Sequence, residues 1–301
     1  MLFFLPPIIK GCCVFSLYTV NTILLCLLLF FVAGVKFIIR TQKASDLCTK
    51  ILIFIATAWI SINSLVIRLF NRIEFDVRGL DKLEKRQWYL VLSNHQSWVD
   101  ILVLQKVLNR KIPMLKFFLK KELIWVPFLG IAWWALDFPF MKRYSKKFIR
   151  KHPHLKGKDF EKTRKACEKF IRTPVSVMNF VEGTRFTKAK KSAGNGKYEN
   201  LLQPKAGGVA FVLGSMNKSL HKIIDVTIVY PGKIPSFWEF ISGKTSKIIV
   251  DLSILPINDS LAGDFFNDKV FKDNFCSWLN TLWEEKDHKI GSILKESGDF
   301  E

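Results

Sequence analysis

A long apolar segment near the start of the sequence constrains the fold more than any other feature. No charged residue occurs between Lys10 and Lys36, and the central residues TILLCLLLFFVAGV are apolar all round a helix. About 20 such residues are enough to cross a bilayer. A cleaved signal peptide fits less well, because the leading residues MLFFLPPIIK are hardly basic and no A-x-A site follows the run. We therefore expect a retained membrane anchor.

A second charge-free segment, residues 51–67, is shorter and contains Ser61, Asn63 and Ser64. Basic residues lie on both sides of it: Lys36, Arg40, Lys43 and Lys50 before, and Arg68, Arg72 and Arg78 after. Because basic flanks favour the cytoplasmic face, a shallow hairpin or an interfacial second helix satisfies both flanks, whereas two full spans do not. We expect membrane-anchoring helices over residues 1–69, one domain over 70–290 on the cytoplasmic side of the cell membrane (the inner membrane in a bacterium), and a flexible tail over 291–301.

The charge of the chain points to the same surface. The 301 residues carry a formal net charge of +20. Together with the apolar segments, this charge favours an anionic membrane surface and membrane lipids as partners, with no nucleic acid. The six cysteines have irregular spacing, which predicts free thiols in a reducing compartment and no metal site.

Downstream of residue 70, short β-branched and aromatic runs alternate with helical stretches. This order predicts an α/β fold with a mixed, largely parallel sheet covered by helices. Amphipathic helices are expected at 158–172 and along a stripe of apolar residues from Phe266 to Trp283. The predicted strands cover residues 73–77, 88–93, 175–181, 223–230 and 247–255.

The segment LIWVPFLGIAWWAL, residues 123–136, is apolar but too short to span a membrane easily. It is either a buried core helix or a helix at the headgroup boundary. A wall of a groove for an acyl chain would need the same kind of surface.

The octapeptide SNHQSWVD, residues 93–100, follows a predicted strand and presents Asn94, His95, Ser97 and Asp100. If His95 precedes a helix that begins near Ser97, Asp100 in the first turn can hold one ring nitrogen while the other takes a proton. The alternative is an ordinary helix start, because Ser97 and Asp100 also read as a capping box.

Two further turns carry groups suited to anions. The residues NFVEGTRF, 179–186, end a strand with Glu182, Gly183, Thr184 and Arg185, and a guanidinium there suits a phosphate. A solvated salt bridge at a strand end is the alternative.

In QPKAGGVAF, residues 203–211, Pro204 and Lys205 precede small residues, including Gly207, that are expected to open a helix. Exposed backbone N–H groups beside an ammonium make an anion site. In FPFMKR, residues 138–143, Arg143 ends an aromatic run.

Taken together, NHxxxxD, FMKR, EGTR and PKAGG resemble the PlsC-type 1-acylglycerol-3-phosphate acyltransferases. The likeness covers about residues 70–235, and NFVEGTRFT, TRKACEKF and LLQPKAGGVAF look most like the YihG-like bacterial branch and its lysocardiolipin acyltransferase relatives. The resemblance implies acyl transfer from acyl-CoA or acyl carrier protein, as a co-substrate and without a further cofactor, to a lysophospholipid hydroxyl. It also implies that His95 is the general base, that Asp100 orients it, and that Arg143, the 182–185 block and Pro204 bind the acceptor.

Other interpretations remain open. The same fold can serve another acceptor, such as lysocardiolipin or lysophosphatidylglycerol. A basic membrane adaptor without enzyme activity, or a nucleic-acid binder, would explain the charge but not the ordered histidine, aspartate and arginine turns.

Overall fold

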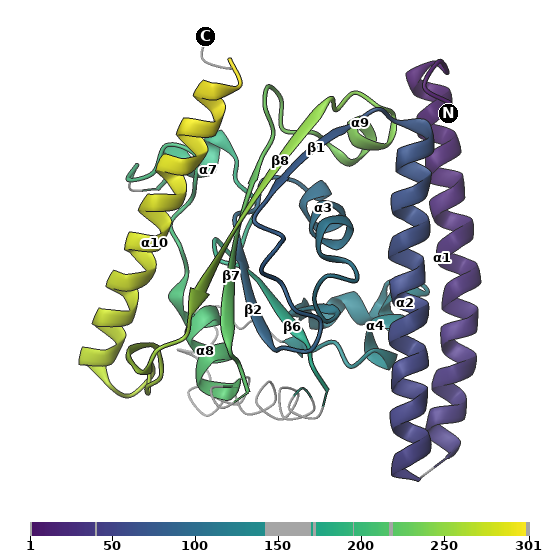
Figure 1. The fold of residues 1–301 in the computed structure, drawn as a ribbon, viewed down its shortest axis with the longest axis horizontal. Helices are drawn as coiled ribbons and strands as arrows, with labels where there is room; N and C mark the ends of the chain where they lie inside the picture. The colour runs from purple at the N-terminus through teal and green to yellow at the C-terminus, as the bar shows by residue number, and fades with distance from the viewer. Residues whose placement is uncertain are drawn as a thin grey trace.

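The computed structural model describes residues 2–39, 41–141, 170, 173–194, 196–216 and 219–298. Helices α1 (Pro7–Ile38) and α2 (Gln42–Phe70) form an antiparallel hairpin beside an α/β domain (Figure 1). Both helices are long and apolar enough to cross a membrane. A hydrogen bond from Asn21 Nδ2 to Asn63 Oδ1, 2.8 Å long and buried, joins the two helices. Helix α2 ends at Phe70, and the sheet begins at Glu74.

The domain is built on a six-stranded sheet with the order β1-β8-β7-β2-β6-β3. All neighbouring strands are parallel except β7 and β8, which are antiparallel. The mixed, largely parallel sheet predicted from the sequence is therefore confirmed. The strands are β1 (Glu74–Arg78), β2 (Tyr89–Ser93), β3 (Leu115–Phe117), β6 (Ser176–Phe180), β7 (Lys222–Val229) and β8 (Lys247–Pro256).

Each face of the sheet has its own apolar core. On the hairpin face, Tyr89 and Val91 of β2 pack with α3 (Val99–Leu108), α9 (Phe237–Ile241) and the ends of the hairpin. On the opposite α10 face, Leu90 and Leu92 pack with α8 (Ala206–Met216) and α10 (Lys269–Glu296). Figure 1 shows α10 and the hairpin on opposite sides of the sheet. Alternate side chains of a strand point to opposite faces, which explains the division.

The apolar segment 123–136 does not form one helix. It is divided between the short helix η1 (Lys121–Trp125) and α4 (Leu129–Ala135), with Pro127 and Phe128 between them. Phe128, the N-cap residue of α4, has φ 61°, a positive value that few non-glycine residues adopt, and it lies where the chain changes direction between the two helices. A two-stranded parallel pair, β4 (Leu119–Lys120) with β5 (Phe140–Met141), brackets these helices. The remaining short helices are α7 (Lys188–Ser192) and η4 (Asp259–Leu261).

The prediction of a flexible tail after Gly291 is wrong through Glu296. Helix α10 continues to that residue because Ile290 and Ile293, both buried, extend the apolar stripe at helical spacing. The helix predicted at 158–172 and the side chain of Arg143 lie outside the described residues, apart from the buried Phe170.

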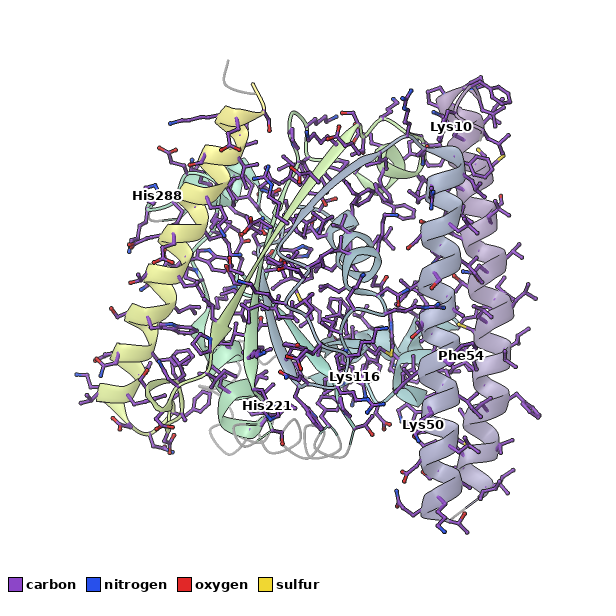
Figure 2. All side chains as sticks on the ribbon, viewed as in Figure 1. Lys10, Lys50, Phe54, Lys116, His221 and His288 are labelled. Carbon is purple, nitrogen blue, oxygen red and sulfur yellow. The ribbon has the colours of Figure 1, made fainter. Side chains whose placement is uncertain are left out.

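Basic residues mark both ends of the hairpin. Figure 2 shows Lys10 near one end of it and Lys50 toward the other. Lys36 and Lys43 are also at the end where α1 meets α2, and Arg68 is at the end where α2 leads into the domain. The long sides of the hairpin carry exposed apolar side chains, among them Phe31, Phe54 and Leu65.

Candidate active site

The site begins at the carboxyl end of the central strand β2. Asn94 follows this strand and is fully buried. Its side-chain amide donates to the carbonyl of Ile228 (2.8 Å) and accepts from the N–H of Ile228 (2.9 Å). These paired bonds fasten the turn after β2 to β7 and fix the direction in which His95 leaves the sheet.

His95 and Asp100 form the contact that the sequence predicts. Nδ1 of His95 lies 2.8 Å from Oδ2 of Asp100, and α3 begins at Val99, so His95 precedes the helix while Asp100 sits in its first turn. An ionised carboxylate can only accept, so Nδ1 carries the hydrogen of this bond. The other ring nitrogen, Nε2, is then the one available to take a proton.

Asp100 is fully buried and is held by several donors. Oδ2 also accepts the backbone N–H groups of Gln96 (2.6 Å) and Ser97 (2.9 Å), and Oδ1 accepts the Tyr230 hydroxyl (2.6 Å). Burial and the neighbouring Asp100 raise the pKa of Tyr230, so its hydroxyl stays a donor. Asp100 therefore holds the helix start and orients His95 at once, while the Ser97 hydroxyl donates to the Pro235 carbonyl.

The imidazole faces an apolar cavity. Its ring stacks on Phe180 with centroids 3.9 Å apart and planes 13° from parallel, and 12% of the side chain is exposed. The cavity, about 280 Å³, lies between the hairpin and the domain and is lined by residues of α1, α2, α3 and α4. Leu129, Ala132 and Leu136 of the 123–136 segment are in this wall. The volume and lining suit an alkyl chain with its reacting end at His95.

Glu182 lies behind the His95 turn rather than in open solvent. It is 1% exposed, and its two carboxylate oxygens accept the backbone N–H groups of His95 (2.8 Å) and Leu202 (3.0 Å). Burial raises the pKa of Glu182 to about 7, against the lowering effect of these two N–H groups. The sequence predicts a contact with an anionic ligand, but both oxygens already serve the backbone. The structure thus gives this carboxylate a role in holding His95.

The rest of the predicted anion turn is cationic. Lys190 Nζ donates to Thr184 Oγ1 (2.7 Å) and to the carbonyl of Arg185 (2.9 Å). The Arg185 guanidinium lies over the Trp98 ring, 4.8 Å from its centroid. Trp98 precedes α3 directly, and the N–H of Phe186 donates to the carbonyl of His95 (2.7 Å), so this turn is adjacent to the His95 segment.

Lys205 completes this turn from the next segment. Gly183 has φ +66°, and a Cβ placed there would come within 3.2 Å of Lys205 Nζ, so glycine lets the ammonium approach the turn. Lys205 follows Pro204 and precedes α8, which opens at Ala206 as predicted. A Cβ on Gly207 would meet nothing within 4 Å, so no close neighbour requires glycine there. Glu182, Thr184, Lys190, Lys191, Lys197 and Lys205 are among the residues that line a cavity of about 250 Å³ at this place.

Sequence reasoning missed several residues of the site. Phe180 under the imidazole and Tyr230 on Asp100 lie at the ends of predicted strands, but the strand pattern did not reveal their contacts. Lys190 belongs to the basic run KAKK soon after the anion turn, and that spacing was a usable signal.

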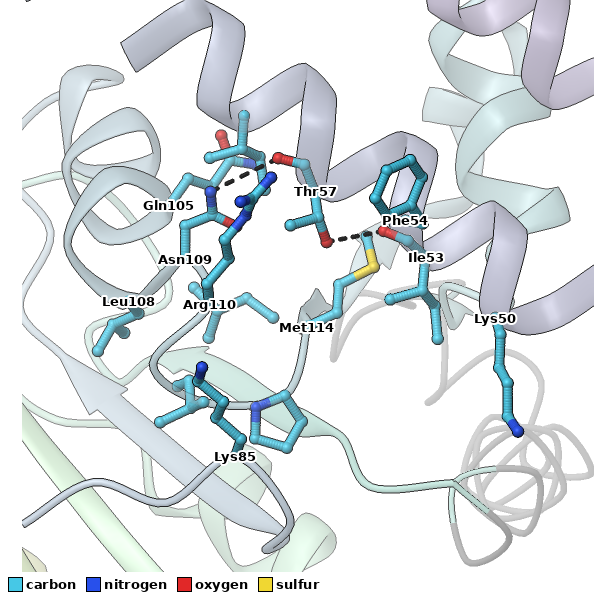
Figure 3. Close-up of a pocket in the computed structure, with 14 residues that line it drawn as sticks. Lys50, Ile53, Phe54, Thr57, Lys85, Gln105, Leu108, Asn109, Arg110 and Met114 are labelled. Atoms are coloured by element: carbon cyan, nitrogen blue, oxygen red, sulfur yellow. Dashed lines mark hydrogen bonds between the residues drawn. The ribbon is translucent and has the colours of Figure 1, made fainter. Parts of the chain in front are cut away.

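A larger cavity, about 440 Å³, lies between α2 and α3 (Figure 3). It shares Ile60, Gln105 and Met114 with the cavity beside His95. In Figure 3, Phe54 and Thr57 approach from α2, opposite Asn109 at the end of α3. Among the described residues that line it there is no histidine and no acid.

Comparison with known proteins agrees with this geometry. A family model described as Acyltransferase matches residues 74–231. "Probable 1-acyl-sn-glycerol-3-phosphate acyltransferase 5" of Arabidopsis thaliana is 27% identical over 207 residues, covering 64% of this chain and 52% of that protein. "2-acyl-1-lysophosphatidylinositol acyltransferase" of Saccharomyces cerevisiae is 26% identical over 247 residues, covering 66% and 59%. The chain thus spans little more than half the length of these relatives.

Among solved structures, the crystal structure of the 1-acyl-sn-glycerophosphate acyltransferase PlsC from Thermotoga maritima matches with a TM-score of 0.47 at 16% identity. The match covers 91% of this chain and 98% of that one.

Proposed function

Because the chain belongs to the Acyltransferase family, we propose that it moves a fatty acyl group from a thioester to the free hydroxyl of 1-acylglycerol 3-phosphate, giving phosphatidic acid. The observation that carries this proposal is the contact of His95 with Asp100 at an apolar cavity beside a cationic turn. Each of the three features answers one demand of the reaction: a proton acceptor, room for an acyl chain, and charge for a phosphate.

The chemistry follows from the imidazole. Nε2 of His95 removes the proton of the acceptor hydroxyl as its oxygen attacks the thioester carbonyl, and Asp100 stabilises the imidazolium that forms. The tetrahedral intermediate collapses with loss of the thiolate, which takes the proton from His95. No residue of the protein becomes acylated, and the acyl-CoA or acyl carrier protein is a co-substrate.

The acceptor phosphate fits the cationic turn. Lys190 bonds Thr184, Lys205 approaches Gly183, and the Arg185 guanidinium lies over Trp98 next to the same turn. A phosphate bound there would hold the glycerol hydroxyl near the imidazole, which converts the attack into an oriented, intramolecular-like step.

The hairpin suits substrates that reside in a bilayer. Its basic ends and exposed apolar sides fit a hairpin that lies along one leaflet while the domain rests on the cytoplasmic surface, because a full crossing would place one set of basic residues on the far side. A fatty chain could then pass from the leaflet into the cavity lined by the same helices.

A different headgroup is the second candidate. One relative is named for lysophosphatidylinositol, and a phosphodiester such as that of lysocardiolipin or lysophosphatidylglycerol also carries charge for the cationic turn. The described residues at the turn include several lysines with flexible side chains, which would accommodate either form of phosphate.

The test is a substrate panel. Purified protein in mixed micelles is given lysophosphatidic acid, lysophosphatidylglycerol, lysophosphatidylinositol and lysocardiolipin, each with acyl-CoA and with acyl carrier protein, and the products are identified by mass spectrometry. We expect phosphatidic acid to form fastest. Faster acylation of another headgroup would favour the second candidate, and no product from any pair would contradict both.

A further inference from the structure

We infer that Lys286 of helix α10 is a positioning residue for the His95–Asp100 pair, acting through Glu182 and strand β7. The role assigned to Lys286 rests on the proposed function, whereas the contacts that Lys286 makes do not depend on it. Helix α10 lies beyond residues 74–231, the part that matches the family model, so nothing in that match assigns it a role.

Lys286 is an unusual residue for its place in the fold. It is 1% exposed on the α10 face of the sheet, where fully buried lysines are rare unless they are paired. Its ammonium donates to the Val226 carbonyl (2.7 Å) and the Thr227 hydroxyl (3.1 Å) and lies 2.9 Å from Oδ1 of Asp225. Three consecutive residues of β7 are therefore held by one side chain from a helix.

The first connection to the site runs along β7. The next residue after Thr227 is Ile228, whose backbone N–H and carbonyl both bond the side chain of Asn94. Asn94 directly precedes His95. By holding β7 from the α10 face, Lys286 therefore also holds the strand to which the turn containing His95 is hydrogen-bonded.

The second connection runs through Glu182. Trp283, one turn before Lys286, donates its indole N–H to the carbonyl of Leu202 (3.0 Å), and the N–H of Leu202 donates to Glu182 (3.0 Å). The other oxygen of Glu182 accepts the N–H of His95. Helix α10 thus reaches the backbone of His95 by two separate series of bonds.

The charge of Lys286 matters because Glu182 works only as an anion. Both of its oxygens accept N–H groups, whereas a protonated carboxyl would present one hydroxyl donor instead. Burial raises the pKa of Glu182, the two N–H groups oppose that rise, the charge of Asp100 adds to it, and the charge of Lys286 opposes it. Lys286 therefore favours the form that holds the His95 turn.

Other ionisable groups near Glu182 must be kept constant in a test of this effect. They come from the His95 turn, from the anion turn with the α7 segment, and from α10: His95, Asp100, Lys190, Lys191, Lys197, Lys205 and Lys286. The chain offers a matched control on α10 itself. Lys289, three residues after Lys286, pairs with Asp251 (2.6 Å) at a part-exposed position away from Glu182.

The experiment compares Lys286→Met, Lys286→Arg and Lys289→Met by the pH dependence of kcat/KM. Removing the Lys286 cation is expected to raise the pKa of Glu182 above about 7. The ionised fraction of Glu182 at pH 7 would then fall, so kcat/KM of Lys286→Met, relative to the wild type, should be lowest near neutral pH and should recover as the pH rises. Lys286→Arg should restore the wild-type profile, and Lys289→Met should not move it.

To separate an effect through Glu182 from an effect on another group, the route is tested in a Glu182→Gln background. There, Lys286→Met should shift nothing further. A shift in that background would mean that the charge acts directly on His95. An equal loss at all pH values, accompanied by a matching loss of folded protein, would mean that Lys286 only supports the fold. Either result overturns the inference.

Two additions keep the test decisive. Lys286→Met leaves Asp225 buried without its partner, so Asp225→Asn/Lys286→Met removes both charges; replacing a whole buried pair is tolerated far better than breaking it. The double variant should shift the profile in the same direction. If the wild type transfers no acyl group, the pH dependence of unfolding, compared with and without Glu182, still reports whether Lys286 lowers the pKa of that carboxyl. Failure of the proposed function is thereby separated from failure of this inference.

Discussion

The two faces of the sheet use buried charge in opposite ways. On the hairpin face, Asp100 is covered by backbone N–H groups and Tyr230 but shares one oxygen with a histidine that opens into a cavity. On the α10 face, Lys286 and Asp225 are enclosed on all sides. In the proposed reaction the first pair exchanges a proton with a bound molecule, whereas the second pair holds strand β7 by its bonds. The hairpin face is therefore the reacting face and the α10 face is the supporting face, and Glu182 connects the two.

The largest expected effect is on the reacting face. His95→Ala should lower the rate of acyl transfer about 10²- to 10⁴-fold, because it removes the general base. Since the side chain is part-exposed and Asp100 keeps its other donors, the melting temperature and membrane association should change little. Both are measured beside the rate. Full activity in His95→Ala would show that His95 is not the general base.

The second effect sharpens the role of Glu182, where the faces meet. The pKa of Glu182 is about 7 in the folded protein and 4.5 in a model compound. Between these values the folded state binds more protons than the unfolded state, so stability falls as pH rises. Relative to Glu182→Gln, the wild type should lose on the order of 3 kcal/mol of unfolding free energy between about pH 4.5 and pH 7.

Chemical unfolding at a series of pH values measures this difference. If the difference in unfolding free energy between the wild type and Glu182→Gln stayed the same at all pH values, the pKa of Glu182 would not be raised by burial.

The third effect belongs to the supporting face. Trp283→Phe leaves the part-buried carbonyl of Leu202 without its indole donor, which should cost about 1 kcal/mol of stability. Activity should fall together with stability, because Leu202 donates to Glu182 and Glu182 accepts the backbone N–H of His95. A loss of activity without a loss of stability would break the division between the two faces.

The smallest effect separates binding from chemistry on the reacting face. Arg185→Ala should raise the Michaelis constant for lysophosphatidic acid about tenfold, or ~1.4 kcal/mol, with little change in kcat, since a phosphate contact is kept through the reaction. Lys269→Ala at the exposed start of α10 removes the same charge far from the turn and serves as the control. An unchanged Michaelis constant for Arg185→Ala would exclude the phosphate contact.

Much of the fold follows from local patterns in the sequence. The five predicted strands are present because continuous runs such as YLVLS and KIIDVTIV are buried on both sides of a mostly parallel sheet. Strands β3, β4 and β5 have only two or three residues each, which is too short to show a recognisable pattern of apolar residues. The break at Phe128 depends on a left-handed residue that no composition signals.

The candidate site could be predicted only as far as its motifs reach. His95 and Asp100 are five residues apart, so helix geometry decides whether they meet. Lys286 stands in the charged run EEKDHK, which is typical of a solvated surface, and its burial depends on strands some 60 residues earlier. Contacts of that separation need the tertiary structure.

The amide pair of Asn21 and Asn63 has a further consequence for the hairpin. In apolar surroundings an amide that loses its partner is costly, so the two helices resist sliding along one another. The two helices would therefore move in a lipid leaflet as one rigid unit. Helix α1 also packs on α4 and α9, so the depth of the hairpin would set the height of the His95 imidazole above the hydrocarbon. That height would decide how far a lipid must move out of the leaflet before its hydroxyl can react.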